Sequence, residues 1–156
     1  MKLAEGLAER AAAVRRVEQL RARIVGSARY QEGETPPEDA AELLADAEQT
    51  LAQLESLIRR INATNATTRL DGDVTITDAL ARRDVLRLRH SLITAAADAA
   101  AGKDQRGLGR QLRSELLMLS ALPVATLRQR ADVLARDLRT VDTQIQRANW
   151  EADLVD

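Results

Sequence analysis

Apolar residues recur along most of this chain at alternating steps of three and four residues, the spacing of one face of an α-helix. The pattern occurs in four stretches and predicts helices over residues 2–29, 38–61, 78–101 and 124–149. Each stretch has an apolar line that we expect to be buried against a neighbouring helix. In chain order these lines are Leu3, Leu7, Val14, Val17, Leu20 and Ile24; Leu44, Ala47, Leu51, Leu54, Ile58 and Ile61; Ala81, Val85, Leu88, Leu92, Ala95 and Ala99; and Leu127, Ala131, Leu134, Leu138, Val141, Ile145 and Ala148.

A second set of apolar residues lies beside these lines in the two middle helices, at Leu43, Leu57, Leu86 and Ile93. The core of one bundle does not easily absorb both lines. Apolar surface that stays exposed favours association between copies of a chain. We therefore expect a homo-oligomer.

The segments that join the first three helices contain helix breakers. Pro36 and Pro37 separate the first two helices, and the second proline fits the first turn of a helix. Residues 62–68 are rich in Asn and Thr, which compete for backbone hydrogen bonds, so the second helix is expected to end before them. The Asp-Gly pair at 71–72 lies between β-favouring residues and predicts a small β-hairpin over residues 68–76.

The region before the last helix is less clear. Residues 102–109 contain three glycines and are interpreted as a flexible loop. Residues 114–120 fit either a strand or a helix. We favour a short strand, because the apolar run is brief and Pro123 follows it, although Leu and Met favour helix. The acidic tail, residues 151–156, is expected to fray.

Helices of similar length with mostly short connections favour an up-down-up-down arrangement. We therefore predict a mainly α fold, an antiparallel four-helix bundle of coiled-coil character. The hairpin and the short strand would be its only β-structure. The length of 156 residues is that of one domain, and we expect a single helical domain over residues 1–156.

This topology brings the end of the second helix and the end of the fourth helix together. The polar residues expected at that end form the candidate ligand or partner site. They are Arg59, Asn62, Asn65, Arg69, Asn149 and Trp150. A simpler interpretation is structural: the Asn side chains cap helix ends, Arg69 pairs with an acid, and Trp150 closes the end of the bundle. Of the two, we favour the structural interpretation.

Composition excludes several function classes. The chain has no Cys and one His, so it lacks thiolate chemistry and the usual metal clusters, and we predict no catalytic, metal or cofactor site. With 23 basic and 24 acidic residues the net charge is −1, which favours neither nucleic acid nor anionic lipid as a partner. No apolar run reaches the ~18 residues of a membrane span, and no signal peptide is recognisable. We expect a cytoplasmic protein without an integral membrane segment.

Several short sequence segments resemble the septicolysin-like family of small, largely uncharacterised bacterial helical proteins. They are Met1–Glu5, Gln31–Glu34 before Pro36, Leu57–Asn62 followed by Thr64-Asn65 and Thr68–Leu70, and Arg147–Trp150. The resemblance covers most of the chain. It implies a haemolysin that is independent of thiols, and therefore a secreted, pore-forming protein.

Three hypotheses for function follow. The first is a non-enzymatic helical protein that acts through self-association or partner binding, which we favour. The second is the haemolytic role that the family resemblance implies. The third is a small-ligand or enzymatic site at the polar end of the bundle.

Overall fold

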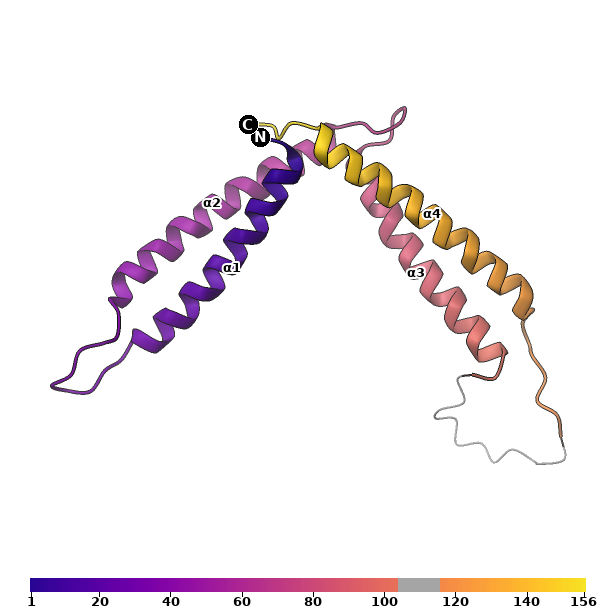
Figure 1. The fold of residues 1–156 in the computed structure, drawn as a ribbon, viewed down its shortest axis with the longest axis horizontal. Helices are drawn as coiled ribbons and strands as arrows, with labels where there is room; N and C mark the ends of the chain where they lie inside the picture. Colours follow the sequence, from indigo (N-terminus) through magenta and orange to yellow (C-terminus); the bar gives the residue numbers. More distant parts are fainter. Residues whose placement is uncertain (104–115) are drawn as a thin grey trace. The chain divides into compact units, whose positions relative to one another are not determined.

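The computed structural model describes residues 1–103 and 116–156, and within them the chain is helical, with no strand. The helices are α1 (Leu3–Ser27), α2 (Ala40–Thr67), α3 (Ile76–Ala100) and α4 (Val124–Glu151) (Figure 1). The prediction of a mainly α, four-helix chain is confirmed. The chain divides into two compact units, residues 1–76 with 147–156, and residues 77–146. The first unit contains α1, α2 and the end of α4, and the second contains most of α3 and α4.

The first unit is built on the pair α1 and α2 (Figure 1). Leu20 is fully buried between the two helices and packs with Leu43 and Ala47. Asp39 caps the start of α2, since its carboxylate accepts hydrogen bonds from the backbone N–H of Ala41 (2.9 Å) and Glu42 (3.1 Å). Two of the backbone N–H groups at the start of α2 thus have a partner in the side chain of the preceding residue.

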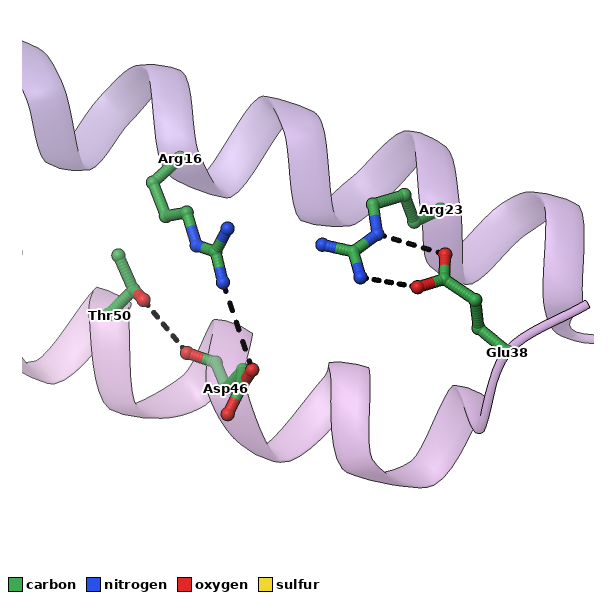
Figure 2. Close-up of polar contacts among 5 residues, drawn as sticks. All are labelled: Arg16, Arg23, Glu38, Asp46 and Thr50. Atoms are coloured by element: carbon green, nitrogen blue, oxygen red, sulfur yellow. Dashed lines mark hydrogen bonds and ion pairs between the residues drawn. The ribbon is translucent and has the colours of Figure 1, made fainter.

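Ion pairs fix α1 against the start of α2 (Figure 2). Arg23 donates two hydrogen bonds to Glu38, one of them of 2.9 Å from Nε to Oε2, and Arg16 lies 3.9 Å from Asp46. The bond from Arg23 lowers the pKa of the Glu38 carboxyl. In the next turn of α2, the Thr50 hydroxyl donates to the Asp46 carbonyl (2.8 Å).

The apolar line of α2 that was expected in the core is only partly buried. Ala47, Leu54 and Ile61 face α1 as expected, but Leu44, Leu51 and Ile58 are 53%, 41% and 39% exposed. The buried side consists of Leu43, Ala47, Thr50, Leu54, Leu57, Ile61 and Thr64. The core therefore takes Leu43 and Leu57 from the second apolar line and leaves three large apolar residues, spaced seven apart, on the surface.

The second unit pairs α3 with α4, and here the expected line of α3 is wrong. Val85, Leu88 and Leu92 are 47%, 71% and 68% exposed, and Ala81, Ala95 and Ala99 are exposed too. The more buried side of α3 in this unit instead carries Ala79, Arg83, Leu86, His90, Ile93 and Ala97. Both sides of α3 are apolar, so the periodicity alone does not say which side meets the partner helix.

Ion pairs between α3 and α4 agree with this rotation of α3. Asp142 lies 3.9 Å from Arg83 and 3.8 Å from Arg87, and Arg128 lies 2.6 Å from Asp98. In α4 the expected line is correct: Leu127, Ala131, Val141, Ile145 and Ala148 are buried, and Leu134 and Leu138 are half-buried.

The second helix does not end before the Asn/Thr segment as predicted, but continues to Thr67. Its threonine hydroxyls find partners inside the helix: Thr64 donates to the Arg60 carbonyl and Thr67 to the Ala63 carbonyl, both at 2.8 Å. These bonds satisfy the side chains that were expected to break the helix. At the next junction α3 begins at Ile76, so Thr77 lies in its first turn instead of preceding it.

The β-hairpin predicted over residues 68–76 is not formed. One isolated bridge joins Arg69 to Thr75, and the Leu70 N–H donates to the Val74 carbonyl (2.8 Å) around Gly72, whose φ is +64°. This is a tight turn with arms too short for strands, because helix begins on either side of it. Residues 116–120 form no strand either. Residues 104–109 of the loop predicted over 102–109, and residues 114–115 of the predicted strand, lie outside the described residues.

The acidic tail does not fray but packs on the first unit. Leu154 is 6% exposed, and the Cβ that Gly6 lacks would lie 2.9 Å from its Cδ2. The backbone N–H of Leu154 donates to the Met1 carbonyl (2.9 Å), and an antiparallel bridge joins Lys2 to Asp153. The side chain of Leu154 and these backbone bonds thus hold the tail against the start of α1.

Candidate functional site

The polar residues predicted as a site all fall in the first unit, near the end of α2 and the end of α4. Arg59, Asn62 and Arg69 are exposed, whereas Asn65 and Asn149 are half-buried. Trp150 is 66% exposed and therefore does not close the end of a bundle. Within the described residues, no hydrogen bond or ion pair joins two of the six, and Arg69 pairs with Asp73 inside the tight turn.

The contacts that organise this end come from residues that sequence reasoning missed. Thr64 is fully buried, and its hydroxyl oxygen accepts a hydrogen bond from the backbone N–H of Val155 (3.0 Å). Arg60 donates from Nε to the Val155 carbonyl (2.7 Å) and lies 3.3 Å from Asp156. These bonds join positions more than ninety residues apart, so no local pattern could have indicated them.

Lys2 ties the start of the chain to the same tail. Its Nζ lies 2.7 Å from a carboxylate oxygen of Asp153 and donates to the Glu151 carbonyl at 3.0 Å. The hydrogen bond from Lys2, aided by its positive charge, lowers the pKa of the Asp153 carboxyl. Because the Lys2 ammonium and the Asp153 carboxylate pair with each other, we interpret their role as structural.

A pH dependence of stability follows from this pair. Because the pKa of Asp153 is lower in the folded chain, the pair stabilises the fold above the unfolded pKa of about 3.9 and loses that effect as the pH falls through the folded value. Asp153→Asn should therefore be less stable than the natural chain at neutral pH and equally stable in stronger acid. Urea unfolding from pH 7 downward measures this, and a difference that persists in acid would contradict it.

The second unit has an open groove between α3 and α4, with a volume of about 460 Å³. Four apolar side chains line it, Leu92, Ile93, Val133 and Leu134, together with Thr126 and Gln129. Leu92 and Val133 are 68% and 49% exposed, so the apolar lining is open to solvent. The volume falls in the range of ligand sites, and the groove is open to solvent.

Two arginines complete the lining, Arg89 from α3 and Arg130 from α4. Neither forms an ion pair or hydrogen bond with any residue of the described ranges, unlike Arg83, Arg87 and Arg128 nearby. An apolar groove with two free guanidinium groups fits an occupant that combines apolar side chains with carboxylates.

Within the described residues, His, Asp and Glu side chains form no group of three that could hold a metal ion. His90 is half-buried on the side of α3 that faces α4. Among the helices of residues 1–103 and 116–156, none carries the long apolar stretch that a membrane span requires.

Comparison with known proteins shows the family of the chain and a similar structure. The model of a family of unknown function, DUF6847, matches residues 10–154. The chain belongs to this family. A crystal structure of a functionally unknown conserved protein from Corynebacterium diphtheriae is similar to the chain, with a TM-score of 0.87, 35% sequence identity and 99% of each chain covered. A search of curated proteins found no match.

These findings overturn the resemblance to the septicolysin-like family. The matching family and the similar crystal structure are both of unknown function, and neither is septicolysin-like. The segments that carried the resemblance lie mostly within α1, α2 and α4, where leucine, arginine and alanine recur in any amphipathic helix. With the resemblance, the haemolytic role that it implied loses its support.

Proposed function

We propose that this member of DUF6847 is a non-enzymatic helical protein that associates with further copies of itself. The observation that carries the proposal is a pair of exposed apolar stripes. The α2 stripe consists of Leu44, Leu51 and Ile58, and the α3 stripe consists of Val85, Leu88 and Leu92.

The spacing of both stripes supports a helical partner. The α2 stripe repeats every seven residues, and the α3 stripe advances by three and then four, as in helices that pack side by side. Single exposed leucines are ordinary on a protein surface, but aligned ones form a continuous apolar patch. Such a patch on each of two helices favours association.

Light scattering after size-exclusion chromatography tests the proposal across the micromolar range. We expect the natural chain to exceed its monomer mass of 17.1 kDa. The variant Leu88→Glu/Leu92→Glu should run as a monomer, because it places two carboxylates in the apolar contact. The matched control, Thr140→Glu/Thr143→Glu, adds the same charge at exposed positions of α4 and should keep the larger mass.

Circular dichroism must give equal helix content for all three proteins, since both stripe residues are exposed. A natural chain that is monomeric at every concentration would overturn the proposal. So would a Leu88→Glu/Leu92→Glu variant that is helical and keeps the mass of the natural chain.

The polar end remains a second candidate, for a small ligand or a partner. What favours it is the 66% exposure of Trp150, which leaves a large aromatic surface beside the half-buried Asn149. Aromatic residues with one polar donor are enriched at binding surfaces.

A further inference from the structure

The groove between α3 and α4 and the exposed face of α2 have complementary chemistry. The groove presents Leu92 and Val133 together with Arg89 and Arg130, two cations without a carboxylate partner in the described ranges. An occupant must therefore supply apolar side chains and negative charge on one face.

The exposed face of α2 has this composition. Between its three apolar residues lie Glu48 and Glu55, so that the face reads Leu44, Glu48, Leu51, Glu55 and Ile58 at steps of four and three. These positions share one side of a helix and extend over about 21 Å at 1.5 Å per residue.

The two glutamates are exposed and form no ion pair with residues of the described part of the chain. Their neighbours on α2 differ, because Asp46 pairs with Arg16 and the preceding Glu38 pairs with Arg23 (Figure 2). Glu48 and Glu55, which α1 does not use, thus lie beside the exposed Leu44, Leu51 and Ile58.

We infer that α2 of a second copy docks in the groove between α3 and α4, with Glu48 and Glu55 facing Arg89 and Arg130. This inference rests on the proposed function and names the contact that self-association would use. Leu44, Leu51 and Ile58 would cover the apolar lining of the groove, and the charged pairs would lie at its borders. The mode is that of an amphipathic helix in a groove.

Charge also disfavours the two simpler pairings. If α2 met α2 of the other copy, Glu48 and Glu55 would face carboxylates, and if α3 met α3, Arg89 would face Arg82 or Arg89. Like charges opposed in an interface weaken association. In a closed dimer each copy offers one α2 face and one groove, so the α2-to-groove contact occurs twice.

Two charge reversals provide the test. The first variant is Glu48→Arg/Glu55→Arg, and the second is Arg89→Glu/Arg130→Glu. Each alone opposes like charges at both contacts of a dimer, and we expect self-association to weaken by about tenfold or more. Mixed in equal amounts, the two variants restore opposite charges at both contacts, and the mixture should recover the mass of the natural chain.

The control is Glu9→Arg/Glu32→Arg. It makes the same change in net charge as Glu48→Arg/Glu55→Arg, at other exposed positions, and should leave association unchanged. Sedimentation equilibrium measures all five samples, with circular dichroism to verify helix content.

The inference and the proposed function can fail separately. If the natural chain associates and loses association in Leu88→Glu/Leu92→Glu, but both charge reversals still associate alone, self-association stands and this contact is wrong. If either reversal dissociates and the mixture does not recover, the contact is wrong as well. If the natural chain never associates, both fail.

Discussion

Leu154→Ala is expected to lower the free energy of unfolding of the first unit by about 2–5 kcal/mol, the range for a buried Leu→Ala change. Leu154 is 6% exposed and rests against Gly6, where a side chain on α1 would collide with it. Leu154 is the buried large apolar residue of the acidic tail. Its loss should also weaken the hydrogen bonds of Arg60 and Thr64 to Val155, because Leu154 is the buried side chain next to Val155 in the tail.

Urea unfolding followed by fluorescence measures this effect, since the single tryptophan, Trp150, lies in the same unit. Val155→Ala is the matched control. Its side chain is 37% exposed and its backbone bonds remain, so the change should stay within about 0.5 kcal/mol. Equal effects of the two variants would mean that the tail frays in solution, as its acidic composition suggests.

The second large effect is expected for Leu86→Ala, with Leu88→Ala as its counterpart. Leu86 is 6% exposed against α4, whereas Leu88 is 71% exposed. Leu86→Ala should cost about 2–5 kcal/mol at every protein concentration. Leu88→Ala should cost less than about 0.5 kcal/mol in dilute protein, because most of the Leu88 side chain is already in solvent.

Concentration separates the two variants further. If the natural chain associates, its unfolding midpoint rises with protein concentration, and Leu88→Ala should reduce that rise while Leu86→Ala leaves it in place. Far-UV circular dichroism in urea measures both. A larger loss for Leu88→Ala in dilute protein would mean that the line Val85, Leu88 and Leu92 faces α4 after all.

The spacing of apolar residues was sufficient to place the four helices. In α4 it also predicted which side of the helix is buried. Outside its buried line that helix carries mostly charged and polar residues, so one rotation buries most of its apolar surface and leaves Val133 exposed. In α3 both sides are apolar, and the pairing of Arg87 with Asp142 from another helix accompanies the rotation that is seen. Contacts of that kind do not show in the local sequence.

The sequence predicted which polar residues lie near one another at the polar end, but not the hydrogen bonds that hold the end together. The expected residues lie in one unit, but the bonds that hold it together come from Thr64 and Arg60. Asn and Thr in 62–68 were interpreted as helix breakers, because their side chains can replace backbone hydrogen bonds. Within α2 the Thr64 hydroxyl instead bonds to the preceding turn and receives the N–H of Val155.

The meeting of Met1 with Leu154, and of Lys2 with Asp153, has a practical consequence for protein engineering. A short peptide could join residue 156 to residue 1, and new termini could be opened in the connection near Gly33, where nothing lies within 4 Å of an added Cβ. Such a circular permutant would keep α1, α2 and the tail in contact, while α1 would become the last of them to be synthesised instead of the first.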